Sequence, residues 1–124
     1  MENSGKIRTF EDLVAWQEAH GLVLLVYKLT KGFPDDERFG LTNQCRRAVI
    51  SVTSNIAEGF GRSSLKDKVH FYTMAKTSLA ELQNQFIAAR DLRYIDIHDY
   101  EKFLTQSITV DKLIAGLIKS AVNK

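Results

Sequence analysis

Apolar residues recur every three or four positions through most of the chain, which is the period of an α-helix. The repeat is most regular in one central segment, at Tyr72, Ala75, Leu79, Leu82, Phe86 and Ala89. Only one proline, Pro34, interrupts the 124 residues, and no Asn-Gly or Asp-Gly pair indicates a β-hairpin. The pattern therefore predicts an all-α chain.

Residues that start or stop helices divide this pattern into four segments. Thr9 and Ser64 are each followed three positions later by an aspartate, which is a common N-terminal capping pattern. Helix-ending glycines follow the apolar repeats at Gly32, Gly59 and Gly61. We expect helices over residues 9–32, 41–61 and 64–93, and a fourth from a cap at Asp96 or Asp99 to the C-terminus.

Helices of roughly 20 to 28 residues joined by short connections pack most simply as antiparallel neighbours. We expect an up-down-up-down bundle formed by a single domain over residues 1–124, with residues 1–8 frayed. The first helix is apolar on more than one side, because the run Leu22, Val23, Leu24, Leu25 and Val26 points in successive directions around its axis. One bundle core cannot bury the whole run, and a second copy of the chain is the simplest cover. The sequence thus predicts a homo-oligomer.

The second predicted helix carries short hydrogen-bonding residues between one arginine and one glutamate. This polar stripe consists of Gln44, Arg47, Ser51, Ser54, Asn55 and Glu58. A solvated helix face usually carries Lys and Glu pairs four residues apart, so the stripe favours close packing against another helix or subunit. Arg47 and Glu58 lie about 16 Å apart along a helix, too far for a direct pair, so we expect their partners within the stripe or on the third helix. If Glu58 is desolvated, Glu58→Ala should lower stability or dissociate the oligomer. The alternative is that these short residues are incidental surface positions.

The charge balance is mild, with 17 Lys and Arg against 15 Asp and Glu and a formal net charge of +2. This balance allows an anionic partner without demanding one. Cys45 is the only cysteine and lies on an apolar helix face, which excludes a disulfide framework and fits a cytoplasmic protein. His20, His70 and His98 lie on different segments, so we expect no metal site and no cofactor. The apolar run 22–27 is too short to span a membrane.

Several short motifs follow one another in an order that resembles a known family. They are Phe10-Glu11-Asp12-Leu13-x-x-Trp16-Gln17, Phe33-Pro34 with Glu37 and Phe39-Gly40-Leu41, Gln44-x-Arg46-Arg47-Ala48 with Ser51 and Asn55-Ile56-Ala57-Glu58-Gly59, and Phe71, Ala75, Ser78, Glu81-Leu82 and Gln85. In these motifs the chain resembles the four-helix bundle proteins encoded in intervening sequences of bacterial large-subunit ribosomal RNA genes. One departure is Thr77, where members commonly carry glycine.

The resemblance implies a left-handed four-helix bundle that assembles into a ring, which is a homopentamer in known relatives. It also implies kinship with the accessory proteins of diversity-generating retroelements, which form similar rings and bind nucleic acid and a reverse transcriptase. The departure at Thr77 bears on how closely the third helix approaches its neighbour.

Five cations are candidates for contacts with a nucleic-acid backbone, namely Arg46, Arg47, Arg62, Lys66 and Lys68. A single copy is only weakly basic, but a ring repeats each cation around its axis and adds the potentials. No aromatic pair alternates with these residues along the sequence, so we expect backbone contacts without base stacking. The alternative is that the cations are solubilising charges paired with carboxylates.

Two other functions stand beside a non-catalytic nucleic-acid scaffold. Arg93 and His98 are separated by four residues, as in the Arg-x4-His element of bundle-shaped toxin ribonucleases, where histidine moves the proton and arginine holds the phosphate. This spacing also arises by chance, and Arg93 suits the C-terminus of a helix, so we do not expect an enzyme. The other alternative is a protein-only adaptor that docks on a partner enzyme such as a reverse transcriptase.

Overall fold

The computed structural model describes residues 6–123, whose regular structure is helical. The long helices are α1 (Val14–Thr30), α2 (Leu41–Gly61), α3 (Leu65–Asp91) and α4 (Ile97–Val122). Two short 3-10 helices, η1 (Phe10–Asp12) and η2 (Asp35–Glu37), precede α1 and α2. The described residues contain no strand, so the predicted all-α class is confirmed. Of the segment 1–8 that we expected to be frayed, residues 1–5 lie outside the described part.

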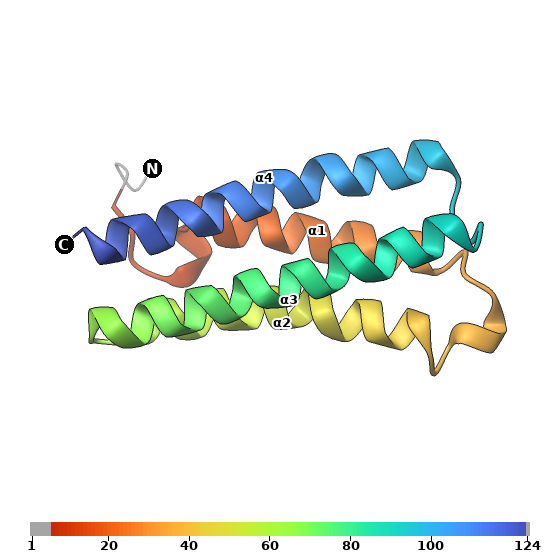
Figure 1. The fold of residues 1–124 in the computed structure, drawn as a ribbon. Coiled ribbons are helices and arrows are strands. Elements are labelled where there is room, and N and C mark those ends of the chain that lie inside the picture. Colours follow the sequence, from red (N-terminus) through yellow and green to blue (C-terminus); the bar gives the residue numbers. More distant parts are fainter. Residues whose placement is uncertain (1–5, 124) are drawn as a thin grey trace.

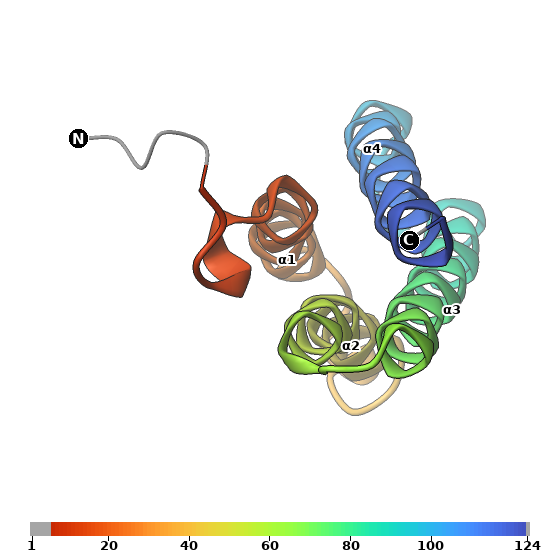
Figure 2. The ribbon, with the colours of Figure 1, turned by 90° about the vertical axis from the view of Figure 1, so that its left-hand side faces the viewer.

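Consecutive helices run antiparallel and lie side by side, and α4 returns next to α1 and α3 (Figure 1). Viewed along their axes, the helices surround one central region (Figure 2). The arrangement agrees with the predicted up-down-up-down bundle. We call the end that holds the α2–α3 turn (residues 62–64) the turn end, and the end that holds residues 31–40 and 92–96 the loop end. The start of α1 and the end of α4 also lie toward the turn end.

The core is built from the apolar side of each helix. Every residue of the central repeat, from Tyr72 to Ala89, is buried as predicted. Phe86 of α3 stacks on Phe103 of α4 with 3.8 Å between the ring centroids, and neither ring is exposed. Complete burial of one such side chain contributes about 1.5–3 kcal/mol to folding, so this stack is a main attachment of α4 to α3.

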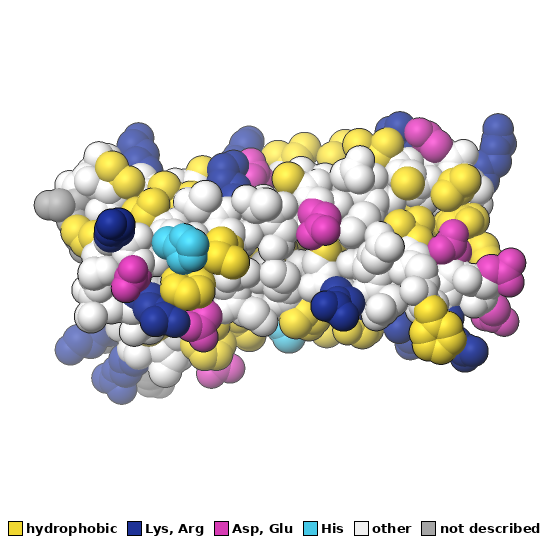
Figure 3. Space-filling model, turned by 60° about the horizontal axis from the view of Figure 1, so that its bottom comes forward, with side chains coloured by type: hydrophobic (Ala, Val, Ile, Leu, Met, Phe, Trp, Pro, Cys, Tyr) yellow, Lys and Arg dark blue, Asp and Glu magenta, His cyan; other side chains and the backbone are white. Residues whose placement is uncertain are grey.

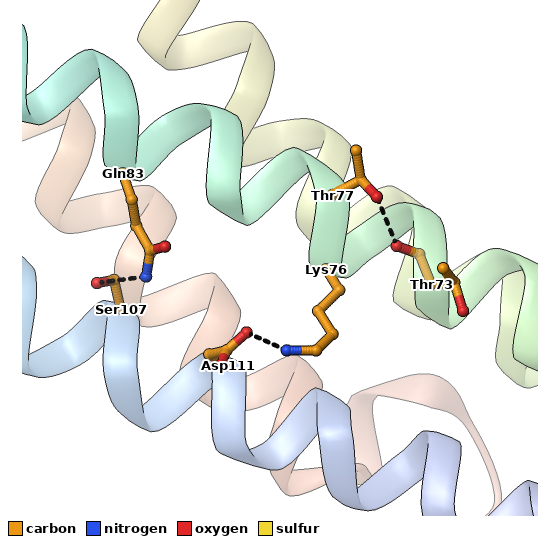
Figure 4. A network of polar contacts seen from close by, with 6 residues as sticks. All are labelled: Thr73, Lys76, Thr77, Gln83, Ser107 and Asp111. Atoms are coloured by element: carbon orange, nitrogen blue, oxygen red, sulfur yellow. Dashed lines mark hydrogen bonds and ion pairs between the residues drawn. The ribbon is translucent and has the colours of Figure 1, made fainter.

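Polar side chains also join α3 to α4 (Figure 4). Lys76 donates through Nζ to Oδ1 of Asp111 at 2.8 Å, and Gln83 donates through Nε2 to Oγ of Ser107 at 3.2 Å. Lys76 is therefore already paired with a carboxylate. Since both side chains of this ion pair are about 40% exposed, solvent screens the pair and its contribution to stability is small.

Thr77, the departure from the family pattern, points away from the bundle. Its side chain is exposed, and its Oγ1 donates to the carbonyl oxygen of Thr73 on the same helix at 3.1 Å (Figure 4). The threonine therefore does not stand between α3 and a neighbouring helix of the same chain. The closeness of α3 to α2 is decided by other residues.

One of these residues is Gly59, which lies inside α2 instead of ending it; Gly61 is the last helical residue. A Cβ atom on Gly59 would lie 2.6 Å from Cε1 of Tyr72, and that side chain is only 4% exposed. The missing side chain therefore lets α2 and α3 approach closely. The prediction that Gly59 stops the helix is wrong, because its role depends on a residue of another helix.

The first helix begins later than predicted, at Val14 instead of directly after Thr9. Leu13 has an extended backbone with ψ of 127°, which separates η1 from α1. The Asp12 carboxylate accepts the backbone N–H groups of Arg8 and Thr9 at 2.8 and 3.0 Å. The Thr9 capping pattern thus stabilises the start of η1 and not the start of α1. The predicted capping of α3 and α4 is confirmed.

The caps of α3 and α4 are single side chains that bond their own first turn. Ser64 Oγ accepts the N–H of Asp67 at 3.1 Å, and Asp96 Oδ1 accepts the N–H of Asp99 at 2.8 Å. Of the two aspartates considered for the last helix, Asp96 is therefore the cap. These bonds satisfy N–H groups that have no partner within the helix.

The bundle buries more of α1 than expected. Leu22, Val23 and Val26 are buried, and Leu25 packs half-buried against the core, whereas Leu24 is 61% exposed. The apolar run is accommodated because α1 contacts both α2 and α4. As predicted, one core does not bury the whole run, because Leu24 remains exposed. A homo-oligomer stays a prediction.

Candidate nucleic-acid interface

The turn end brings together three of the five candidate cations, Arg62, Lys66 and Lys68. Arg62 directly follows α2, and both lysines lie in the first turn of α3. The unpaired N–H groups at the N-terminus of α3 add partial positive charge to this end. Glu58 and Asp67 are the nearby carboxylates in sequence. Figure 3 shows charged, histidine and hydrophobic side chains crowded at this end, on the left of the view.

Lys68 closes the C-terminus of α2. Its Nζ donates to the carbonyl oxygens of Gly59 at 3.2 Å and Phe60 at 2.8 Å, and it lies 5.5 Å from the centroid of the Phe60 ring. Carbonyl groups at a helix C-terminus lack partners within the helix and carry partial negative charge. Lys68 is therefore a half-buried cation that joins α3 to the end of α2, with part of its charge already balanced.

Arg62 combines an ion pair with an aromatic contact. Its guanidinium bonds to the Glu58 carboxylate one turn earlier, and its Cζ lies 4.5 Å from the centroid of the Phe71 ring. His70 lies edge-on to the same ring, with 5.1 Å between centroids. The Arg62 side chain is 43% exposed, so solvent reaches the guanidinium while the ring lies beneath it.

Aromatic rings therefore lie among the cations at the turn end. No aromatic pair alternates with the cations along the sequence, but the α2–α3 turn folds Phe60 against Lys68 and Phe71 against Arg62. Sequence reasoning missed these pairs since each joins a residue at the end of α2 to one on α3. The short connection could have indicated these pairs, because it places the last turn of α2 next to the first turns of α3.

The other two candidate cations lie elsewhere. Arg47 precedes Arg62 by 15 residues, which is about 22 Å along a helix. Arg46 donates through Nε to Oγ1 of Thr30 at 2.9 Å, and its Cζ lies 4.6 Å from the centroid of the Tyr27 ring, so Arg46 joins α2 to α1. Arg47 is exposed. The five predicted cations thus form two separate groups.

The centre of the polar stripe packs against α3. Ser51 and Ser78 share a hydrogen bond of 2.8 Å between their hydroxyl oxygens, and Asn55 donates through Nδ2 to the Ser51 carbonyl oxygen at 2.9 Å. These short side chains are half-buried between α2 and α3. The same face of the molecule shows a broad band of uncharged side chains and backbone in Figure 3.

The ends of the stripe differ from its centre. Glu58 bonds to Arg62, which lies neither in the stripe nor on α3, so the predicted location of its partner is wrong. The Glu58 side chain is 54% exposed in the single chain. Its partner is Arg62 because α2 continues through Gly59 and places residue 62 one turn beyond residue 58. Gln44, Arg47 and Ser54 are exposed.

A shallow groove between α2 and α3 runs beside Arg47. Ser51, Glu81 and Gln85 contribute to its lining. Gln85 is 7% exposed, and within the described chain its Oε1 is buried without a hydrogen-bond partner. Leaving such an acceptor unpaired costs about 1–3 kcal/mol, so the Gln85 amide lowers the stability of the bundle at this point.

Arg93 and His98, the pair considered for a ribonuclease, do not converge. The structure ends α3 at Asp91, two residues before the expected position, and Arg93 has a left-handed backbone with φ of 65°. Arg93 borders a depression with Tyr94, whereas His98 is exposed and borders another one with Lys102. Within the described residues no hydrogen bond joins Arg93 to His98.

A polar contact ties the loop end together. Glu37 accepts the backbone N–H of Leu41 through Oε1 at 2.9 Å and the hydroxyl of Tyr94 through Oε2 at 2.8 Å. The Leu41 N–H, followed by the Tyr94 hydroxyl, holds the pKa of Glu37 below its ordinary value. The same bond to the carboxylate raises the pKa of Tyr94. Glu37 therefore links the start of α2 to the α3–α4 connection.

Other kinds of site have less support in the described part of the chain. Residues 6–123 contain no group of three or more His, Cys, Asp or Glu side chains that could hold a metal ion. Burial raises the pKa of the Cys45 thiol to about 12, so Cys45 is an uncharged core residue near neutral pH. None of the described helices is both long and apolar enough to cross a membrane.

Comparisons with known proteins give a family and a fold. The family model described as 23S rRNA-intervening sequence protein matches residues 11–116. The chain is also similar to a crystal structure of a protein with unknown function from the S23 ribosomal protein family of Bacteroides thetaiotaomicron VPI-5482, with a TM-score of 0.79 and 21% identity. That match covers 86% of this chain and 99% of the other, and it supports the fold alone. No curated protein matches the chain.

Proposed function

The chain belongs to the 23S rRNA-intervening sequence protein family, and on that premise we propose that it is a non-catalytic scaffold that binds RNA or DNA. The observation that carries the proposal is the turn end, where Arg62 directly follows α2 and Lys66 and Lys68 lie in the first turn of α3. Lys66 is exposed, and Arg62 is partly exposed beside it. Phosphate groups would be attracted by these cations and by the N-terminus of α3.

The proposal includes a left-handed bundle that assembles into a homo-oligomeric ring, with the pentamer favoured by the family resemblance. Leu24 is 61% exposed on α1. A neighbouring copy would bury this leucine. Cyclic symmetry then places the turn ends of all copies on one circle, so that weak contacts with a single nucleic acid add together.

Fluorescence polarisation with labelled RNA and DNA over a series of salt concentrations tests binding. We expect affinity to fall steeply with salt, because phosphate contacts release counterions, and we expect the nucleic acid to stay intact on a gel. Failure to bind at low salt would contradict the proposal. Cleavage that disappears in His98→Ala would support the ribonuclease alternative instead.

Mass photometry at micromolar concentration tests the ring. We expect a homo-oligomer for the natural chain and a shift toward monomer for Leu24→Glu, because a charge at a covered apolar position is costly. Thermal melting of the variant checks that its helices remain folded, which the exposure of Leu24 leads us to expect. A natural chain that stays monomeric would contradict the ring.

The loop end favours a second function, the protein-only adaptor. Phe39 is 84% exposed there, and Leu92 and Ile97 are 55% and 60% exposed. Exposed aromatic and large aliphatic side chains are typical anchors of protein interfaces. A reverse transcriptase is the partner class that the resemblance implies. Loss of co-purification with that enzyme in Phe39→Ala, with nucleic-acid binding unchanged, would support the adaptor.

A further inference from the structure

We propose that the turn end holds unpaired nucleobases by stacking, so that the protein prefers single-stranded to double-stranded nucleic acid. This inference rests on the proposed nucleic-acid function and names the substrate class of the same site. It is carried by the planar side chains of Arg62, His70 and Phe71, which lie against one another at the start of α3.

Arg62 and His70 both lie against the ring of Phe71, and the Arg62 side chain is partly exposed. The Cζ atom of Arg62 lies 4.5 Å from the centroid of the Phe71 ring, and His70 stands edge-on to that ring at 5.1 Å. The guanidinium is planar, weakly hydrated and partly exposed, so a base can stack on the side away from the ring. Stacking on arginine and aromatic side chains is a general way in which proteins hold unpaired bases.

The arrangement is held in place by contacts within the chain. The Glu58 carboxylate bonds to Arg62 from one turn earlier on α2. The Cβ of Phe71 lies 3.3 Å from the position that a Cβ would take on Gly59, so the backbone of α2 fits closely against the base of the ring. Because these groups are ordered before binding, less conformational freedom is lost when a base stacks on them.

Lys66 is the cation placed to meet the phosphate next to a stacked base. It is exposed and lies four residues before His70, so both side chains share one face of α3. Lys68, by contrast, is occupied by the carbonyl oxygens of Gly59 and Phe60. Arg62 and His70 therefore provide the stacking surfaces, and Lys66 provides the contact with the phosphate.

Charge alone predicts the opposite preference. A duplex has the higher density of phosphates, so a site that works only by charge binds a duplex at least as tightly as a single strand. The bases of a duplex are already stacked and paired, and they present their edges in the grooves. A preference for single strands is thus a direct sign of stacking at the turn end.

Fluorescence polarisation at one low salt concentration tests the inference with three labelled probes, oligo(dT), oligo(rU) and a duplex of equal length. We expect both single strands to bind more tightly than the duplex. Arg62→Lys keeps the charge and removes the planar group, so we expect it to weaken single-strand binding about five- to tenfold, with less than about a twofold change for the duplex. The affinities for oligo(dT) and oligo(rU) show whether the site binds DNA or RNA more tightly.

Arg38→Lys is the matched control, since Arg38 is an exposed arginine of the loop end whose Cζ also lies over an aromatic ring, 5.0 Å from the centroid of Phe39. It makes the same chemical change, and we expect it to alter none of the three affinities. Thermal melting checks the fold of each variant. Equal binding of single strands and duplex, or an equal loss for both in Arg62→Lys, would overturn stacking and leave the proposed function standing. Absence of binding to all three probes would overturn both.

Discussion

The turn end and the loop end each place an arginine over an aromatic ring, yet their surroundings give these pairs different roles. At the turn end the Cζ of Arg62 lies 4.5 Å from the centroid of the Phe71 ring. At the loop end the Cζ of Arg90 lies 4.9 Å from the centroid of the Tyr100 ring, while its Nε donates to Asp91 at 2.9 Å. The two distances are nearly the same.

The charge around these contacts differs more than the contacts themselves. The sequence places six carboxylates in or next to the segments of the loop end, at Asp35, Asp36, Glu37, Asp91, Asp96 and Asp99, against the four cations Lys31, Arg38, Arg90 and Arg93. At the turn end Glu58 and Asp67 accompany the three cations. A phosphate backbone is therefore attracted more strongly to the turn end than to the loop end. A cation over a ring is thus not by itself a nucleic-acid site, because the charges around it decide what approaches.

Adding a side chain at Gly59 should have the largest effect on the stability of the turn end. We expect Gly59→Ala to lower the free energy of unfolding by about 1–3 kcal/mol, because the new Cβ overpacks the buried Tyr72 ring. Gly61→Ala is the matched control, since no atom lies within 4 Å of its added Cβ, and alanine favours a helix over glycine by up to about 1 kcal/mol. Urea denaturation measures both variants. Equal stabilities would contradict the close approach of α2 and α3.

Reversing one charge at each end tests whether the ends differ in binding. We expect Lys66→Glu to weaken nucleic-acid binding and to reduce the salt slope by about one unit, as the loss of one phosphate contact does. Lys31→Glu makes the same change at an exposed residue of the loop end. We expect it to leave the salt slope unchanged. Polarisation titrations at several salt concentrations measure both, and equal losses would mean that net charge alone matters.

The fold could be predicted from the sequence to a large extent because it depends on local periodicity. The repeat of α3 identified its buried side, and Ser64 marked its start, since a cap bonds residues of its own first turn. Thr9 misled the prediction because the same capping pattern serves a 3-10 turn. Gly59 also misled the prediction, because a glycine that ends a helix and one that leaves room for a ring of the next helix look alike in a sequence.

The candidate site could be predicted only in part. The cations of the turn end were identified by their charge, but the ring beneath Arg62 belongs to another helix. The bond between Tyr94 and Glu37 joins residues 57 positions apart, so no local pattern indicates it. Contacts of this kind depend on how helices are placed, and the period of an apolar repeat does not encode them.

Acid should reduce the stability of the loop end, because Glu37 becomes protonated. The pKa of Glu37 lies below its ordinary value of 4.5 in the folded chain, so this carboxylate contributes stability above that pH and loses it as the pH falls through the lower folded pKa. We expect Tyr94→Phe to be less stable than the natural chain at neutral pH, and the difference to shrink in acid. Urea midpoints at neutral and acidic pH measure it. A difference that is independent of pH would contradict a bond to the charged carboxylate.

Removing the carboxylate beside Arg62 should have the smallest effect on stability. The Glu58–Arg62 pair is about half exposed and lies within one turn, so we expect Glu58→Gln to lower the free energy of unfolding by about 0.5 kcal/mol or less. Binding of nucleic acid should become slightly tighter, because one negative charge leaves the turn end. Glu81→Gln, at an exposed carboxylate farther along α3, should not change binding. A stability loss of about 3 kcal/mol or more would mean that a neighbouring copy desolvates Glu58 in the assembled protein.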